Sequence, residues 1–348
     1  MLRQALLSAE ALAQAVGRLP RVRLAYLPTP LEACPRLSQE LGVRVLIKRD
    51  DLTGLAFGGN KARHLEFRLA DALARGCDVF INSNEWVSNN ARLVAAACAK
   101  VGLRYVFIVR NGHGKPLQGN LLLDYLLGSD LHLLQGGDRA AAQRYAREVA
   151  ERLRAQGHTP YVAPDEPFAR ISGTVGYLLA TLELAEQLAA AGVEGEVYVY
   201  LVAGTSMAGL ALGARLLGLP WRVRGMYVGD RPDIEAQVLD YAQQVRERLG
   251  LPATLEPAEA PVWDVTGPAY AVPSPEGVEA IKLVARTEAV LLDPNYTGKA
   301  MGGLLGHVRQ GLVPQGATVV FVHTGGLPAL FVDPAALTAP DFPAAVTP

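Results

Sequence analysis

The chain has 348 residues, of which 50% are hydrophobic and 19% are charged, and its formal net charge is −1. This composition is typical of a soluble protein with a sizeable core, and the length predicts about two domains. A net charge near zero gives no reason to expect nucleic acid or a membrane as partner. The three cysteines have no CxxC spacing, so we expect neither a disulfide framework nor a metal site.

The first third of the chain is expected to lead from a helix to a strand and a glycine-rich loop. Residues 1–19 place charges among apolar residues, which predicts an amphipathic helix and not a signal peptide, so we expect a cytoplasmic protein. Residues 27–30 are a proline turn, and residues 34–41 a helix. The apolar run 43–47 predicts a strand that ends in the loop before a helix at 62–73.

Farther along, strands and helices alternate, which predicts parallel sheets covered by helices on both faces. The expected strands are 78–82, 105–109, 130–134, 197–202, 222–227 and 317–323. The expected helices are 90–101, 118–127, 138–155, 175–190, 210–216, 233–249 and 276–287. Residues 160–173, rich in Pro and Gly, are the candidate crossing between domains, and the tail after Phe331 is expected to be extended.

Lys61 follows two glycines and stands at the start of an expected helix. Gly58 and Gly59 permit backbone angles that a side chain would forbid, and they let another group approach the main chain. The helix dipole disfavours an ammonium ion at this end, which suits an amine nucleophile. On spacing alone, a solvated surface lysine is the more ordinary interpretation.

The segment 48–63 resembles the cofactor-lysine segment of pyridoxal-phosphate (PLP) enzymes with the tryptophan-synthase-β-like fold. It is most similar to the D-cysteine desulfhydrase and 1-aminocyclopropane-1-carboxylate (ACC) deaminase family, in which motifs like residues 23–32 and Lys-Arg-Asp-Asp at 48–51 also precede Gly-Gly-Asn-Lys. The resemblance implies that Lys61 binds PLP as a Schiff base and then acts as the base at the substrate Cα.

The same resemblance implies the architecture of the whole chain. It predicts an α/β protein with two three-layer domains, mostly parallel sheets and PLP in the cleft between them. Residues 1–60 and 175–348 would form the larger, PLP-binding domain, and residues 61–174 the smaller one. It also predicts a homodimer.

A polar loop at residues 83–92 lies between an expected strand and an expected helix. Helix capping by Ser88 or Asn89 is the ordinary interpretation, although N–H groups at a helix N-terminus also bind carboxylates. The loop resembles the family pattern Gly-Gly-x-x-Ser-Asn-His/Gln-x-Arg, with Arg92 as its last residue. The resemblance implies that Asn89 holds the phenolic oxygen O3′ of PLP and that Ser88, Asn89 and Asn90 bind the substrate carboxylate. It also makes Ser88 a candidate catalytic residue.

The loop departs from the family pattern at two places. Asn84 and Glu85 replace the Gly-Gly pair, and Asn90 replaces His or Gln. A Glu85 carboxylate near the substrate carboxylate would repel it, unless Glu85 is protonated, paired or turned away. Alternatively, Glu85 would select a substrate that bears an amine or a hydroxyl.

Another glycine-containing loop, residues 203–209, also joins an expected strand to an expected helix. It is neither a P-loop nor a GxGxxG motif, so a tight turn of small residues is the ordinary interpretation. It resembles the Gly-Gly-Thr-x-Ala-Gly phosphate cradle of the family. The resemblance implies that the PLP phosphate is held by Gly204, Thr205, Ser206, Ala208 and Gly209.

Two tyrosines stand in expected loops beside Gly and Pro, Tyr270 in the segment 267–270 and Tyr296 in the segment 293–301. A packed aromatic ring with its hydroxyl at the surface is the ordinary interpretation. The second segment resembles the family's Asp-Pro-x-Tyr-x-Gly-Lys-x-Met. The resemblance implies that both tyrosines face the substrate and take part in catalysis. Thr297 would contact the substrate, where ACC deaminases carry Glu and desulfhydrases carry Thr.

The last candidate is His323-Thr-Gly-Gly326, at the end of an expected strand. We expect His323 to be a hydrogen-bonded histidine at the end of the strand. By resemblance, the hydroxyl of Thr324 meets the pyridine nitrogen of PLP. A neutral partner leaves this nitrogen less protonated than a carboxylate would, which favours elimination over transamination.

These motifs together predict a PLP-dependent lyase or deaminase that acts on a small amino acid. The expected reaction is β-elimination from D-cysteine, with release of pyruvate, ammonia and sulfide. ACC deamination is the main alternative, followed by elimination from L-cysteate or another β-substituted amino acid. A PLP-binding protein without turnover is a further alternative, suggested by Asn84 and Glu85.

Overall fold

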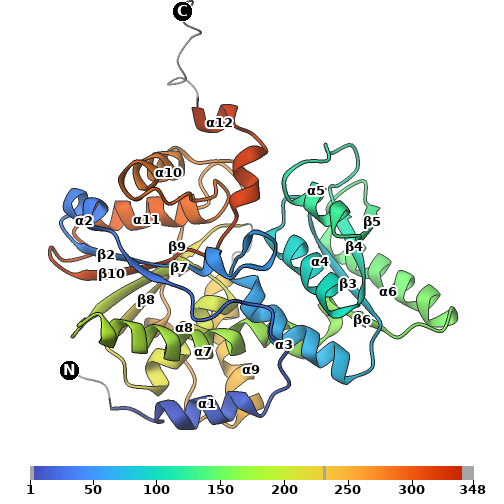
Figure 1. Cartoon of the computed structure of the whole chain (residues 1–348), viewed down its shortest axis with the longest axis horizontal. Coiled ribbons are helices and arrows are strands. Elements are labelled where there is room, and N and C mark those ends of the chain that lie inside the picture. The colour runs from blue at the N-terminus through green and yellow to red at the C-terminus, as the bar shows by residue number, and fades with distance from the viewer. Residues whose placement is uncertain (1–3, 230–232, 339–348) are drawn as a thin grey trace, which may run out of the picture.

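A computed structural model describes residues 4–229 and 233–338, and within them the strands form two separate sheets (Figure 1). The larger sheet has the order β1-β2-β10-β7-β8-β9. Its strands are β1 (Leu31–Ala33), β2 (Arg44–Lys48), β7 (Val197–Val202), β8 (Trp221–Tyr227), β9 (Val262–Asp264) and β10 (Thr318–Val322). All neighbours pair in parallel except β1, which is antiparallel to β2 at the edge.

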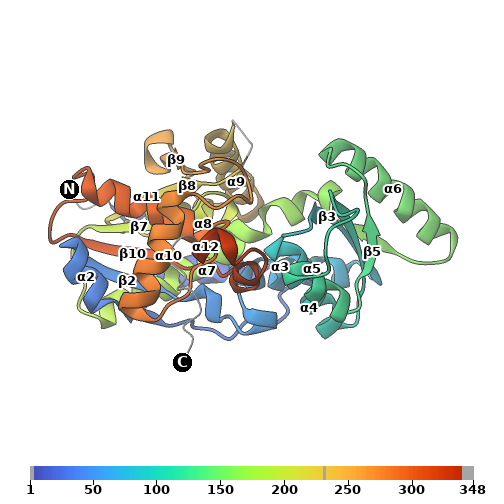
Figure 2. The same cartoon turned by 90° about the horizontal axis from the view of Figure 1, so that it is seen from above.

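The smaller sheet is wholly parallel, with the order β5-β4-β3-β6. Its strands are β3 (Val79–Glu85), β4 (Arg104–Arg110), β5 (Asp130–Leu133) and β6 (Pro160–Val162). Seen from above, the larger sheet and its helices occupy the left of the molecule and the smaller sheet the right, with α3 (Lys61–Ala74) between them (Figure 2).

Helices cover both faces of each sheet, because the strands alternate apolar side chains toward either side. On the larger sheet, Val199 and Val320 face the helices α1, α7, α8 and α9, whereas Tyr200 and Phe321 face α2, α10 and α11. Their bounds are α1 (Ala9–Gly17), α2 (Pro35–Leu41), α7 (Pro167–Ala190), α8 (Thr205–Leu216), α9 (Ile234–Leu249), α10 (Pro275–Glu288) and α11 (Thr297–Arg309).

The smaller sheet is covered in the same way. Phe80 and Phe107 pack toward α3, α4 and α5, and Ile81 and Ile108 toward α6. These helices are α4 (Asn89–Val101), α5 (Gly119–Leu126) and α6 (Arg139–Ala155). Two three-layer α/β units with mostly parallel sheets are therefore confirmed. The assignment of residues 1–60 and 175–348 to one domain, and of residues 61–174 to the other, stays a prediction.

The helix expected at 175–190 begins eight residues earlier, at Pro167, inside the segment 160–173. That this segment is the crossing between the domains stays a prediction. That segment holds β6, a 3₁₀ turn and the first turns of α7. Glycine inside a helix is intrinsically unfavourable, but here it permits close packing. A Cβ on Gly176 would lie 2.6 Å from the carbonyl oxygen of Arg63 in α3, and one on Gly173 would lie 2.4 Å from Thr205 Oγ1 in α8.

The segment 293–301 was expected to be a loop, but α11 begins within it at Thr297. Its glycine, Gly298, suggested a loop, yet it too serves helix packing, since a Cβ there would lie 2.8 Å from Ile281 Cδ1 of α10. The short strands β1, β6 and β9 were not predicted. The tail contains a helical turn, α12 (Ala335–Thr338), and its remainder lies outside the described residues.

The N-terminal helix is shorter than expected, and α1 starts only at Ala9 because Ser8 caps it by accepting a hydrogen bond from the Ala11 N–H. Residues 1–3 of the predicted helix lie outside the described residues. In the part of the chain that the structure describes, none of the helices combines the length and the apolar character needed to cross a membrane.

Candidate active site

Three loops of the larger sheet meet at one edge, because each follows the carboxyl end of a parallel strand. The loop 49–60 follows β2, the loop 323–326 follows β10, and the turn 203–204 follows β7, and these three strands are neighbours. Ligands of open α/β sheets bind in the crevice at this edge. The sheet order therefore brings the loops that carry Lys61, Thr324 and Gly204 to the same edge of the larger sheet. Its neighbouring strands β2, β10 and β7 are labelled in Figure 1.

The loop before Lys61 rests directly on the loop that contains Thr324. The N–H of Asn60 donates to the Thr324 carbonyl oxygen at 3.1 Å. A Cβ on Gly325 would lie only 2.8 Å from the Cα of Gly59, so the two main chains touch at these glycines. Asn60 and α3 then present Lys61, which is half-buried, at the first position of the helix.

The lysine loop is conformationally strained. Ala56 and Phe57 have φ angles of 39° and 65°, followed by Gly58 at 65° and Gly59 at 135°. A left-handed backbone costs about 1–2 kcal/mol for a residue with a Cβ, so neighbouring contacts must hold these two residues. The guanidinium of Arg92, which is fully buried, does so by donating to the Ala56 carbonyl and, at 3.1 Å, to the Gly58 carbonyl.

A buried ionic cluster supports α3 from the other side. Arg63 donates to both oxygens of Asp50 at 2.8 and 2.9 Å and to both oxygens of Glu183 at 2.8 and 2.9 Å. Lys48 also pairs with Glu183, and the Tyr177 hydroxyl donates to Asp50. These pairs fix the first turn of α3, which carries Lys61, relative to β2 and α7.

The turn after β7 has the geometry of an anion site. Gly204 has φ 140°, which excludes other residues, and a Cβ placed there would meet nothing within 4 Å. The start of α8 therefore faces open space, and its first N–H groups point to that space with the positive end of the helix dipole. Ala208 and Gly209 pack into the core behind this turn, and a Cβ on Gly209 would lie 2.5 Å from the Thr174 carbonyl oxygen of α7.

The hydroxyl of Ser206 joins α8 to α3. It accepts a hydrogen bond from Asn60 Nδ2 at 2.9 Å and lies 3.0 Å from His64 Nε2. Burial, together with Lys61 and two arginines, holds the pKa of His64 well below its usual value, so this ring is neutral. The cradle expected at 203–209 is thus attached to the residue before Lys61.

Ser88 and Asn89 stand at the N-terminus of α4, as expected. The Ser88 hydroxyl accepts from the Ala91 N–H at 3.3 Å, so it caps the helix and retains its own proton to donate. The Asn89 Oδ1 accepts from Asn120 Nδ2 at 2.9 Å. Asn90 is half-exposed beside them. The loop itself is shorter than predicted, because residues 83–85 continue β3.

Tyr270 and Tyr296 come together although 25 residues separate them in the chain, and their hydroxyl groups form a hydrogen bond. Tyr296 is the residue before α11, and Tyr270 lies in a tight turn with Ala271, whose φ is 60°. Lys299 holds this turn by donating to the Ala269 carbonyl at 2.9 Å. Burial raises the pKa of both tyrosines, and the nearby charge of Glu85 adds to the effect, so both are neutral.

Thr297 forms the turn before α11. Its hydroxyl donates to the Asp293 carboxylate at 2.7 Å and accepts from the Asp293 N–H at 2.8 Å, and the residue is fully buried. Asp293 also accepts from the N–H groups of Asn295 and Tyr296, both at 3.0 Å. The hydroxyl of Thr297 is thus engaged within its own turn, and a direct substrate contact stays a prediction.

Glu85 is paired. It ends β3 opposite Arg110 of β4, whose guanidinium lies 3.5 Å away, and it accepts from Asn111 Nδ2 at 3.0 Å. A cavity of about 670 Å³ opens here, lined among others by Glu85, Trp86, Asn111 and Tyr270. Glu85 could avoid repelling a substrate carboxylate by being protonated, paired or turned away, and in the structure it is paired.

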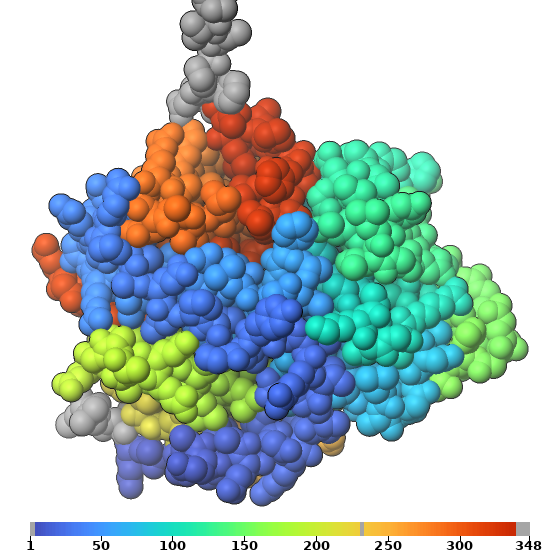
Figure 3. Space-filling model, in the orientation of Figure 1, coloured from blue at the N-terminus to red at the C-terminus, as the bar shows by residue number. Residues whose placement is uncertain are grey.

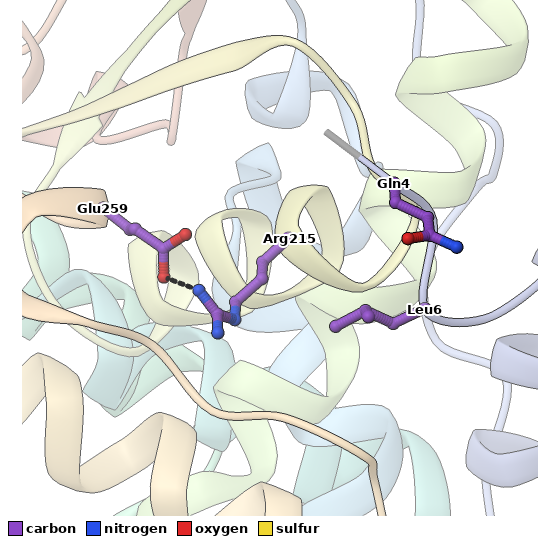
Figure 4. Close-up of a pocket in the computed structure, with 4 residues that line it drawn as sticks. All are labelled: Gln4, Leu6, Arg215 and Glu259. Carbon is purple, nitrogen blue, oxygen red and sulfur yellow. Dashed lines mark hydrogen bonds and ion pairs between the residues drawn. The ribbon is translucent and has the colours of Figure 1, made fainter. Parts of the chain in front are cut away.

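A second hollow, of about 340 Å³, lies where the N-terminal segment meets the far end of α8 (Figure 4). Gln4, Leu6, Arg215 and Glu259 line it, and the last two form an ion pair. Arg215 is near the C-terminus of α8, whereas Gly204 precedes its N-terminus. This hollow is therefore separate from the loops around Lys61.

His323 is the hydrogen-bonded histidine that we expected. Its Nε2 lies 3.0 Å from the Leu291 carbonyl oxygen and its Nδ1 accepts from the Gly325 N–H at 3.3 Å. The proton is therefore on Nε2. Sequence reasoning missed Asn60, His64, Asn120 and Asp293. The first three act through contacts across 28 or more positions, and Asp293 acts at a helix start that was not predicted. Asn60 and Asp293 had a local signal, because they stand in the motifs of Lys61 and Tyr296.

Comparisons with known proteins agree with this geometry. A family model described as "Pyridoxal-phosphate dependent enzyme" matches residues 22–325. A D-cysteine desulfhydrase of Salmonella choleraesuis (strain SC-B67) is 40% identical over 322 residues, which are 90% of this chain and 96% of the relative. A protein of Pyrococcus abyssi (strain GE5 / Orsay), named provisionally as an ACC deaminase, is 39% identical over 91% of this chain and 94% of its own length.

A crystal structure described as an ACC deaminase homologue has the same fold. It superposes with a TM-score of 0.86 at 34% identity and covers 96% of this chain and 99% of its own. The residues described above suit PLP, because Gly204 faces open space at the N-terminus of α8, where an anion is favoured, and Lys61 carries a primary amine. Thr324 lies in a loop that contacts the lysine loop, and Asn89 begins α4, which packs on residues 55–57 of the lysine loop.

Proposed function

Since this chain belongs to the family of pyridoxal-phosphate-dependent enzymes, we propose that it is a PLP-dependent lyase that eliminates the β-substituent of D-cysteine. The products would be pyruvate, ammonia and sulfide. One observation carries the proposal: the lysine loop contacts the Thr324 loop directly, through the Asn60 N–H and the Gly59–Gly325 contact. This contact supports a single site made of Lys61 and the cofactor-binding loops.

PLP is the cofactor, and when bound it withdraws electrons from the substrate Cα. The turn at Gly204, with Thr205 and Ser206, would bind its phosphate. Asn89 would donate a hydrogen bond to the phenolic oxygen, and Thr324 would meet the ring nitrogen. The cap of α4, from Ser88 to Asn90, would bind the substrate carboxylate.

Proton transfer falls to Lys61 and the tyrosine pair. Lys61 would remove the Cα proton of the substrate as the general base. The two tyrosine hydroxyls share one hydrogen bond, which leaves one O–H free to donate. Because burial keeps both tyrosines neutral, this O–H could protonate the sulfur that leaves from Cβ.

The choice of D-cysteine over ACC rests on residue 297 and on Glu85. Opening of the ACC ring needs a group that steers a proton to carbon, and position 297 offers only a hydroxyl that Asp293 already binds. A thiolate is a good leaving group and needs less help there. The pairing of Glu85 with Arg110 and Asn111 reduces repulsion of the substrate carboxylate. ACC deamination is the runner-up, followed by elimination from L-cysteate or a related β-substituted amino acid.

We also propose a cytoplasmic homodimer. Five of the large exposed apolar side chains in the described residues lie on three segments: Leu52 and Phe57 near η2 (Leu55–Phe57), Tyr125 and Leu126 of α5, and Phe331 of η5 (Leu327–Phe331). α5 packs on η5, and α4 on η2, and these segments lie near one another on one face (Figure 3). An apolar face of this kind fits a second copy of the chain. The three free cysteines fit a reducing compartment.

The experiment is an amino-acid panel with the purified protein. D-cysteine should yield pyruvate and sulfide, whereas ACC should yield little 2-oxobutanoate. Borohydride reduction should attach the cofactor to the peptide that contains Lys61, and K61A should show neither attachment nor turnover. Rapid 2-oxobutanoate release without pyruvate would favour the ACC alternative. Cofactor attachment without any product would favour a PLP-binding protein that lacks turnover.

A further inference from the structure

Asn120 of α5 connects two parts of the site that sequence motifs treat separately. Its Nδ2 donates to the Val87 carbonyl at 2.8 Å and to Asn89 Oδ1 at 2.9 Å, and its Oδ1 accepts from Arg92 Nε at 2.9 Å. Asn120 is only 2% exposed. The remaining nitrogens of Arg92 bind the strained lysine loop, so a continuous chain of hydrogen bonds runs from Asn89 to that loop.

The orientation of the Asn120 amide follows from two hydrogen-bond partners, one of which can only accept and the other only donate. A carbonyl oxygen can only accept, and a guanidinium N–H can only donate. The Asn120 nitrogen must therefore face Val87, and its oxygen must face Arg92. The same nitrogen reaches Asn89, so Asn89 must present its oxygen to Asn120. The NH₂ group of Asn89 is then left to donate on its other side.

We infer that Asn120 is a positioning residue, which fixes the Asn89 amide so that Asn89 donates to the phenolic oxygen of PLP. This inference rests on the proposed function, because it takes Asn89 to face that oxygen. Asn120 itself does not touch the cofactor. It also holds Arg92, which binds the carbonyl groups of the lysine loop. One side chain thus orients both the Asn89 amide and the arginine that holds the lysine loop.

A change of one group tests the inference. In N120D the new carboxylate still accepts from Arg92 Nε, but it can no longer donate to Asn89. The Asn89 amide should turn to donate to the carboxylate, and its oxygen would then face the phenolic oxygen of PLP. Loss of a hydrogen bond to a charged group predicts about 10- to 100-fold weaker PLP binding, measured by titrating the dialysed protein.

Two further variants separate orientation from general damage. In an N89A background there is no amide to turn, so N120D should weaken PLP binding by less than about twofold. D124N, a buried change one turn along the same face of α5, should bind PLP within about twofold of the parent chain. An equal loss from N120D in both backgrounds, or no loss in the parent chain, would overturn the inference.

A measurement without PLP keeps the test independent of the proposed function. With asparagine labelled by nitrogen-15, the side-chain NH₂ of Asn120 should exchange slowly with water and that of Asn89 rapidly. In N120D the Asn89 NH₂ should become the slow one, since it now bonds to a buried carboxylate. An Asn89 NH₂ that exchanges at the same rate in both proteins would contradict the turn, whereas a failure of wild-type PLP binding would concern the proposed function alone.

Discussion

Arg63 and Arg92 are both fully buried and both support the segment that carries Lys61, yet their surroundings are opposite. Arg63 faces two carboxylates, and although burial opposes its charge, Asp50 and Glu183 hold its pKa well above the usual value. Arg92 binds two carbonyl groups and one amide, and burial lowers its pKa to about 10. Arg63 is therefore a buried cation with anionic partners. Arg92 is a buried cation with only neutral hydrogen-bond partners, and it holds a strained loop.

The largest effect is expected when the compensated arginine is removed. R63A leaves Asp50 and Glu183 buried with only Lys48 as a cation, and breaking a buried ion pair costs about 3–5 kcal/mol. Denaturant titration should show this loss in the free energy of unfolding, with PLP attachment lost only as the protein unfolds. A loss below about 1 kcal/mol would mean that these ion pairs contribute no more to stability than ion pairs exposed to solvent.

The second-largest effect on stability is expected at Asp124, the carboxylate with the largest electrostatic influence on Arg92. Within the described residues neither of its oxygens has a hydrogen-bond partner, and burial raises its pKa from 3.8 to about 8, against the effect of Arg92. Between these pH values the folded state binds more protons than the unfolded state. Stability contributed by Asp124 is therefore complete below pH 4 and is lost as the pH rises toward 8.

D124N should remove this dependence. From pH 5 to 7 the wild-type free energy of unfolding should fall relative to that of D124N by up to about 1.4 kcal/mol per pH unit. Parallel denaturant titrations at both pH values measure the difference. Identical slopes would show that Asp124 is ionised at neutral pH, and Arg92 would then have a counter-charge as Arg63 does.

The smallest effect on stability is expected from R92K. An ammonium group cannot replace the three-sided contact with Ala56, Gly58 and Asn120, but release of the strained φ angles at Ala56 and Phe57 offsets part of the loss. We expect about 1–2 kcal/mol less stability together with a clear loss of PLP attachment at Lys61. R63K is the matched control. Equal loss of PLP attachment in R63K and R92K would contradict the claim that Arg92 alone holds the strained lysine loop.

The sequence allowed good prediction where local rules decide the structure. The strand before the lysine loop, the helix start at Lys61 and the cap by Ser88 follow from apolar runs, glycines and short polar side chains. Prediction failed where packing overrode a local preference. Gly173 was expected to lie before a helix, and Gly298 in a loop, yet both lie in helices whose neighbours leave no room for a Cβ.

The candidate site shows the same division. Family motifs identified Lys61, Asn89 and the two tyrosines, but they contain no information on orientation. The sequence does not reveal that Arg110 pairs with Glu85, or that the hydroxyl of Thr297 is bound by Asp293. Such facts depend on which strands are neighbours and on how far a turn bends, and both are set by the whole sheet.

The close contacts of α7 have a mechanical consequence. Gly176 lets α3 rest on this helix, and Gly173 and Gly209 let α8 rest on it as well. The lysine at the start of α3 and the Gly204 turn at the start of α8 are thus supported by one helix, which is 24 residues long. The distance between Lys61 and Gly204 is therefore set by how closely α3 and α8 pack on α7.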